Sequence, residues 1–180
     1  MANCCGYNMV AVAPKKETLE RLIKIMNYED DEYFIYRCGG AYADGDISFD
    51  KDSNLWYVGI IGEVAWSAGR WFDTTENTKQ LIQIGCENKD YTKPIYGTAH
   101  YITLDLLCQR LDFGVEVFGE ESGCCFQEWY SVDHNGEVQS DSAEWVEHWC
   151  DDDGNELDEP YEEGGLDYYC EFNDYETIYG

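Results

Sequence analysis

Residues 7–27 read YNMVAVAPKKETLERLIKIMN. The first seven follow the two-residue alternation of a β-strand. Pro14 comes next, and proline is well placed in the first turn of a helix. From residue 15 to residue 27 the apolar side chains recur at helical spacing, at Leu19, Leu22, Ile23 and Met26. This stretch therefore predicts a strand that leads directly into an amphipathic helix.

Further strands are predicted between residues 33 and 66. Residues 33–38 are rich in aromatic and β-branched side chains and end at Gly39-Gly40, so they form a second expected strand. Residues 47–49 and 55–66 are apolar and flank a polar run, which predicts a hairpin. Residues 67–93 show no pattern that assigns a structure, although residues 78–84 have the composition of a short helix.

A second helix and a second hairpin follow. Thr103 is a suitable N-cap for a helix over residues 104–111, and residues 113–118 then read as a strand. The turn sequence Asp133-His134-Asn135-Gly136 lies between two β-rich runs. Asn-Gly in that position is a strong short-range signal for a β-hairpin.

The order of these elements predicts the fold class. We expect an α+β fold, namely a ferredoxin-like βαββαβ antiparallel sheet with two helices on one face, plus an extra C-terminal hairpin and an acidic extension. A chain of 180 residues suits one domain with an appendage. We therefore predict a ferredoxin-like α+β domain over residues 1–140 and an acidic, aromatic-rich extension over residues 141–180 that packs on it.

Two stretches resemble a known family. The chain opens with MANCCGYNMVAVA, and residues 104–138 read LDLLCQRLDFGVEVFGEESGCCFQEWYSVDHNGEV. Discontinuously, over about the first 140 residues, these stretches resemble the ferredoxin-like domain of Api92-like and plasmid YubB-like proteins. Such proteins carry a Thr-Ala-Trp-Ser-Pro-Pro element before the second helix, where residues 98–103 here read TAHYIT. The resemblance implies a ferredoxin-like fold and a setting in bacterial phages, plasmids or other mobile elements, and it implies no catalytic residues.

Charge is distributed very unevenly along the chain. The formal net charge is −27, and all 11 Lys and Arg residues lie at or before Arg110. Residues 1–110 contain sixteen Asp and Glu and have a balance of −5, whereas residues 111–180 contain twenty-two and have a balance of −22. A surface of this sign disfavours direct binding to DNA or RNA and favours a strongly basic partner.

The acidic segment over residues 141–176 is expected to be ordered. An acidic run is usually a solvated loop, but thirteen aromatic residues lie between Phe113 and Tyr179. Aromatic side chains of that number can hold the segment on a core. Duplex DNA carries one charge per roughly 1.7 Å of axis, so twenty-two carboxylates on one face would match about 37 Å of duplex. The segment therefore suggests nucleic-acid mimicry.

Other chemistries are less well supported by the residue spacing. A loop starting at Asp151 would place Gly154 at position four, whereas an EF-hand requires glycine at position six. Zinc ligands are typically clustered, yet there is no Cys-x-x-Cys and the three histidines are dispersed. The glycines form neither a Walker nor a dinucleotide-binding loop. We predict no cofactor, no metal site and no catalytic residue, and a non-enzymatic function.

The predicted function is that of a mobile-element inhibitor, of the anti-CRISPR or anti-restriction kind, that blocks the basic groove of a nucleic-acid-binding nuclease or effector. The alternatives are a non-enzymatic interaction module whose acidity serves solubility, and an enzyme with unrecognised chemistry. The candidate partner-binding residues are Asp141, Glu144, Glu147, Asp151, Asp152, Asp153, Glu156, Asp158, Glu159, Glu162 and Glu163.

The expected location is the cytoplasm of a bacterial host cell. Residues 1–10 read MANCCGYNMV and contain no basic leader, and no apolar run reaches 18 residues. We therefore expect neither secretion nor a membrane partner. Nine cysteines, without the spacing of a compact disulfide framework, predict reduced thiols.

Overall fold

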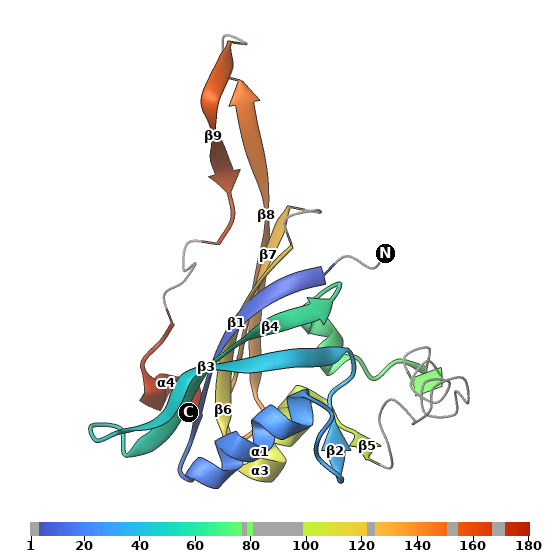
Figure 1. Ribbon diagram of the computed structural model, residues 1–180, viewed down its shortest axis with the longest axis vertical. Helices are drawn as coiled ribbons and strands as arrows, with labels where there is room; N and C mark the ends of the chain where they lie inside the picture. The colour runs from blue at the N-terminus through green and yellow to red at the C-terminus, as the bar shows by residue number, and fades with distance from the viewer. Residues whose placement is uncertain (1–3, 77–78, 81–98, 122–124, 151–154, 167–171) are drawn as a thin grey trace.

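The computed structural model of this chain describes residues 4–76, 79–80, 99–121, 125–150, 155–166 and 172–180. It has a mixed α+β fold (Figure 1). In chain order its elements are β1 (Cys4–Ala13), α1 (Lys16–Met26), β2 (Tyr33–Phe34), β3 (Cys38–Asp50), β4 (Leu55–Ala65), the 3-10 helix η1 (Ala68–Phe72), β5 (His100–Tyr101), α3 (Leu104–Leu111), β6 (Gly114–Glu121), β7 (Phe126–Val132), β8 (Val138–Cys150), β9 (Glu156–Gly164) and α4 (Tyr175–Tyr179).

The main sheet has seven strands in the order β3-β4-β1-β6-β7-β8-β9. Every neighbouring pair is antiparallel. Strand β1 lies in the middle of the first four, between β4 and β6, although both of these strands come later in the chain. A separate two-stranded sheet joins β2 and β5 in parallel.

Helices α1 and α3 cover one face of the sheet (Figure 1). The apolar stripe of α1, including Leu19 and Leu22, packs with Leu107 of α3 against side chains of β1, β4 and β6. Since successive strand residues point to opposite faces, alternate residues of β1 such as Tyr7 and Met9 enter this core. This is the main hydrophobic core of the protein.

Helix α4 packs on the other face. Its Ile178 is fully buried against Val12 of β1 and Leu55 of β4. Gly114 makes this close packing possible, because a Cβ atom there would clash with the backbone carbonyl of Ile178. The last residues of the chain therefore return to the middle of the sheet.

Several sequence predictions are confirmed and two are wrong in detail. The α+β class, the helix over residues 104–111 and both hairpins are confirmed. The strand expected over residues 33–38 is wrong, because β2 ends at Phe34 and Arg37 adopts a left-handed conformation with φ of 58° before β3 begins. The number of strands is also wrong, because β8 continues to Cys150 and pairs with the unforeseen strand β9.

The proposed division between residues 140 and 141 falls inside β8. The chain crosses that position as one continuous strand. Among the described residues, no helix combines the length and apolar character needed to cross a membrane. The expected short helix over residues 78–84 lies largely outside the described residues.

Candidate partner-binding surface

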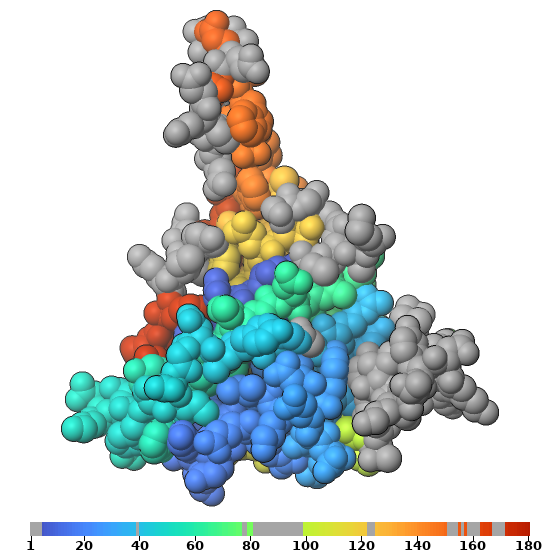
Figure 2. Space-filling model, viewed as in Figure 1, coloured from blue at the N-terminus to red at the C-terminus, as the bar shows by residue number. Residues whose placement is uncertain are grey.

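Strand β8 has two environments along its length. From Val138 to Glu144 it pairs with β7, so that Asp141 lies opposite Trp129. From Trp145 onward it pairs with β9, where Trp145 lies opposite Gly164. The two strands extend beyond the rest of the sheet as a ribbon (Figure 1). In Figure 2 the outer part of β8 projects from the rest of the molecule. We call residues 145–150 and 156–164 the arm, and the rest of the described chain the body.

The eleven predicted partner-binding residues divide between these regions. Asp141 and Glu144 are exposed on the part of β8 that belongs to the body. Asp151, Asp152 and Asp153 lie outside the described residues. The remaining six are on the two strands of the arm: Glu147 on β8, and Glu156, Asp158, Glu159, Glu162 and Glu163 on β9. The structure therefore brings a majority of the predicted set onto one projecting ribbon.

Carboxylates occupy both faces of the arm. In the backbone register Glu147 lies opposite residue 162, and its exposed side chain lies on one face of the ribbon. The neighbouring pair, Val146 opposite Glu163, faces the other way because side chains alternate along a strand. On that second face, Nε2 of His148 lies 3.1 Å from Oε2 of Glu163. The arm thus presents negative charge in two directions.

Two large apolar side chains on the arm are exposed. The exposed fraction is 54% for Val146 and 53% for Trp149. The indole N–H of Trp149 donates a hydrogen bond to Oε2 of Glu147 at 3.2 Å, which places an aromatic ring beside a carboxylate. Tryptophan is frequent among the residues that dominate binding energy at protein interfaces. The arm therefore carries both charge and an apolar anchor.

The base of the arm is fixed to the body by main-chain contacts. The backbone N–H of Trp145 donates to the carbonyl of Cys125, and that of Gly165 donates to the carbonyl of Glu144. The N–H of Leu166 donates to Oε1 of the buried Gln127 at 2.9 Å. Trp145 itself is only 9% exposed. These contacts hold the first residues of the ribbon, whereas no third strand lies beside its outer part among the residues that the structure describes.

Three acidic residues of the C-terminal half do not contribute to any surface charge array. Glu116, Glu121 and Glu128 are between 1% and 4% exposed. A single face that carries all twenty-two acids is therefore excluded, because strands β6 and β7 bury these three. Sequence reasoning did not identify these three residues as buried, because the local sequence around an acidic strand residue does not show which distant groups will donate hydrogen bonds to it.

Glu128 illustrates how such a carboxylate is accommodated. Its Oε2 accepts a hydrogen bond from the hydroxyl of Ser67 at 2.6 Å and another from the hydroxyl of Tyr130 at 3.1 Å. Its Oε1 accepts from the backbone N–H of Ala68 and from Sγ of Cys5. Burial and the charge of Glu128 raise the pKa of both Cys5 and Tyr130, so both stay protonated as donors. Glu128 thus joins η1 to β7.

Glu116 fixes the returning C-terminal segment in the same way. It accepts a hydrogen bond from the indole N–H of Trp129 at 2.6 Å. It also accepts from the backbone N–H and the side-chain amide of Asn173, at 2.8 and 2.7 Å. Buried carboxylates of this kind are tolerated because each has several donors. We assign Glu116 and Glu128 a structural role.

Within the described residues, no group of three or more His, Cys, Asp and Glu side chains is arranged to hold a metal ion. Comparison of the chain with protein-family models, curated proteins and solved structures finds no match. The resemblance to Api92-like proteins therefore stays a prediction.

Proposed function

We propose that this protein is an acidic nucleic-acid mimic that blocks a basic nucleic-acid-binding groove of a host defence protein, with the arm as the part that enters the groove. The observation that supports the proposal is a projecting ribbon that holds six of the predicted carboxylates and no Lys or Arg. A ribbon of two strands is narrow enough to enter the major groove of DNA. A ribbon of that width also fits a protein groove that accommodates a nucleic-acid strand.

The number of acidic residues per unit length of the arm is close to the number of phosphates per unit length of a nucleic-acid strand. Residues 145–150 span five steps of about 3.3 Å, or roughly 17 Å. Six carboxyl groups over that length correspond to one for about every 3 Å. Phosphates follow one another at about 3.4 Å along one strand of duplex DNA. A cleft that binds phosphates with Lys and Arg would therefore meet a similar linear charge density on the arm.

The arm is more than a solubilising acidic loop. An isolated two-stranded ribbon is marginally stable in water, and like charges on it destabilise the folded state further. The exposed Trp149 adds apolar surface, which solubility alone does not require. A basic partner would neutralise the carboxylates and cover the indole ring, so binding offsets each of these costs.

The exposed Val146 and Trp149 also favour a second candidate function. In that case the chain is a non-enzymatic interaction module of a phage or plasmid, anchored to its partner by these apolar side chains. Salt distinguishes the two functions. A mimic complex weakens steeply as salt is added, because phosphate-like contacts depend on counterions and exposed charges are screened within about 10 Å at 0.1 M. An apolar interface changes little.

The ferredoxin-like fold and the location in a bacterial host cell are also proposals. The strand order β3-β4-β1-β6, with α1 and α3 in the two crossovers, supports a ferredoxin-like βαββαβ arrangement extended by β7, β8 and β9. A member of the Api92-like group would act in the cytoplasm of a bacterial host. The proposed partner is a nuclease or effector there.

The direct test is competition for a nucleic-acid-binding site. A labelled DNA duplex is bound to each of a panel of purified restriction endonucleases and CRISPR effector nucleases, and its displacement is followed by fluorescence anisotropy. The arm variant carries Glu147→Lys, Asp158→Lys, Glu159→Lys and Glu162→Lys. We expect the wild type to displace the duplex from at least one panel member and the arm variant to do so about tenfold more weakly or worse.

A matched body variant controls for total charge. Glu17→Lys, Glu29→Lys, Asp46→Lys and Glu63→Lys change four exposed carboxylates of the body and alter the net charge by the same amount. This variant should compete within about threefold of the wild type, since its substitutions lie outside the arm. Equal loss in both variants would reject the arm as the binding element, and no displacement by the wild type from any panel member would reject mimicry.

A further inference from the structure

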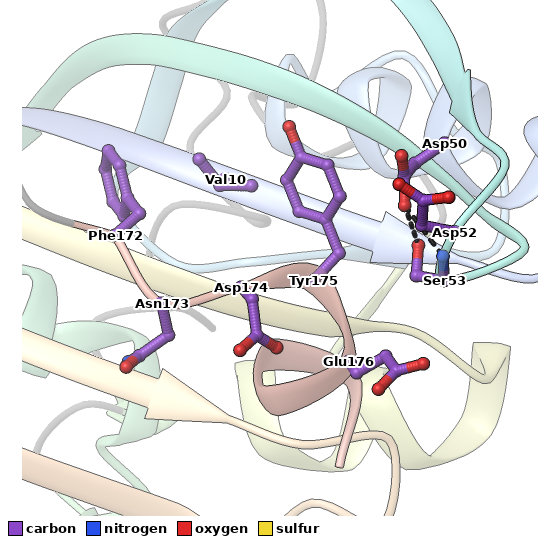
Figure 3. Close-up of a pocket in the computed structure, with 9 residues that line it drawn as sticks. All are labelled: Val10, Asp50, Asp52, Ser53, Phe172, Asn173, Asp174, Tyr175 and Glu176. Atoms are coloured by element: carbon purple, nitrogen blue, oxygen red, sulfur yellow. Dashed lines mark hydrogen bonds between the residues drawn. The ribbon is translucent and has the colours of Figure 1, made fainter.

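A groove crosses the face of the sheet on which α4 packs. It consists of two adjoining hollows of about 550 and 310 Å³, which share Val10 and Phe172. Three segments that are distant in sequence form its walls: β1, the turn between β3 and β4, and the C-terminal residues that lead into α4 (Figure 3). Sequence reasoning missed this groove, because no local pattern signals that these segments meet.

The floor of the groove is apolar and aromatic. Val10, Ile61, Phe118 and Phe172 line it, and Ile61 is 42% exposed although it lies in the middle of a strand. In Figure 3 the ring of Tyr175 stands between Phe172 and the Asp50–Ser53 turn. Tyr175 stacks on Tyr57, with ring centroids 4.4 Å apart and planes inclined by 20°. This stacking holds the ring in a fixed position.

The rim of the groove is acidic. Among the described residues, its lining contains the carboxylates Asp44, Asp50, Asp52, Asp174 and Glu176, and no Lys, Arg or His. Lys51 belongs to the same turn as Asp50 and Asp52 but is not among the lining residues. Hydrogen bonds from Ser53 lower the pKa of Asp50, and those from Thr177 lower the pKa of Asp174, so both carboxyl groups are ionised at neutral pH.

An apolar floor with separated carboxylates at its edge matches a particular ligand chemistry. Lys and Arg side chains combine a long aliphatic stem with a charged end group, so the stem can lie on apolar surface while the charge reaches a carboxylate. A guanidinium or ammonium group is also attracted to the face of an aromatic ring. The described lining carboxylates do not converge in a metal-binding cluster, which fits an extended cation better than a compact one.

We propose that this groove binds an extended Lys- or Arg-bearing segment of the partner protein, and that it is a second contact separate from the arm. The identity of the partner rests on the function proposed above. The aromatic floor and the acidic rim are properties of the body alone. A partner that fills the groove would remove Ile61 from water and pair the rim carboxylates with its own cations.

Binding of a fluorescein-labelled tetra-arginine peptide, measured by anisotropy at physiological salt, tests the groove directly. The variant Asp52→Asn/Glu176→Gln removes two rim charges but leaves Asp50, which accepts hydrogen bonds within its turn, and Asp174, which caps α4. We expect its dissociation constant to rise about fivefold or more. The control Glu17→Gln/Glu29→Gln removes two exposed charges elsewhere and should stay within about twofold.

A second pair of variants tests the floor of the groove and leaves all the rim carboxylates in place. Ile61→Lys places a cation in the groove and should weaken peptide binding, whereas Gln139→Lys adds the same charge at an exposed position of β8 and should not. Equal binding by the groove and control variants in both pairs would overturn the inference, because the peptide would then be held by general charge.

The two proposals can fail separately. The arm variant defined above retains the groove, so it should still bind the peptide in a manner sensitive to Ile61→Lys while failing to displace the duplex. Loss of duplex competition together with unchanged, groove-sensitive peptide binding supports both ideas. Peptide binding that is unchanged by the groove substitutions would reject only the second contact.

Discussion

The body and the arm use the same residue types in opposite ways. In the body, Glu116 and Glu128 are buried, and each receives several hydrogen bonds from neighbouring strands and loops. In the arm, Glu147 and Glu163 are exposed on a ribbon that no other described helix or strand covers. The comparison shows that an acidic sequence does not by itself specify an acidic surface. The number of neighbouring elements decides whether a carboxylate anchors the fold or faces a partner.

Tryptophan shows the same contrast and offers the largest expected effect. Trp71 is fully buried and meets the ring of Tyr7 edge to face at 5.0 Å, whereas Trp149 is 53% exposed. We expect Trp71→Ala to lower the free energy of unfolding by about 3–5 kcal/mol and Trp149→Ala by less than about 0.5 kcal/mol, as measured by urea denaturation. Similar losses in the two variants would mean that arm and body do not differ in packing.

Replacing a buried carboxylate should have the next largest effect. Glu128→Gln keeps the shape of the side chain but puts an NH2 group where donors now point, so at least one buried donor loses its acceptor. The expected loss of unfolding free energy is about 1–3 kcal/mol. Glu147→Gln on the arm is the matched control, and its stability should be unchanged. A neutral result at Glu128 would contradict its assignment as an anchor.

A smaller effect should appear at α4 on acidification. The backbone N–H of Thr177 donates to Asp174 at 2.8 Å, which with the Thr177 side chain lowers the pKa of Asp174 below its usual 3.8. A lowered pKa in the folded state stabilises the docked helix above pH 3.8, and this stabilisation is lost as the pH falls through the lower value. NMR signals of the Tyr175 and Tyr179 rings should report the undocking.

Asp174→Asn provides the control for that titration. An asparagine can still cap the helix through its carbonyl oxygen but has no carboxyl proton to bind. The ring signals of this variant should therefore lose the part of their pH dependence that comes from position 174. An unchanged titration would assign the transition to other groups near α4.

The smallest effect on the body should follow removal of the arm. Because Trp145 lies opposite Gly164, residues 146–163 can be replaced by a two-residue Asn-Gly turn that joins the strands in register. We expect the unfolding free energy of the body to change by about 0.5 kcal/mol or less. A loss well above that value would show that the arm and body unfold together.

Much of the body could be predicted from local patterns. The helix over residues 104–111 and the Asn135-Gly136 hairpin are confirmed, because hydrophobic period and turn chemistry are properties of a few neighbouring residues. The capping role predicted for Thr103 is wrong, because this residue holds the N-cap position but its side chain makes no capping hydrogen bond. Strand β9 was not predicted, since residues 156–164 read ELDEPYEEG and have a poor strand composition. Its pairing depends on β8, which supplies a partner strand that local composition does not reveal.

By itself, the sequence determined the mixed α+β class, the order of the body's main elements and the restriction of all Lys and Arg to residues at or before Arg110. Only the tertiary structure decided which acids are buried, which lie on the arm and which surround the groove. Glu128, Glu147 and Asp52 look alike in sequence, yet they lie in a hydrogen-bonded interior, on a projecting ribbon and at the rim of a hollow. Burial and charge environment depend on contacts between distant segments, and those contacts exist only once the sheet has formed.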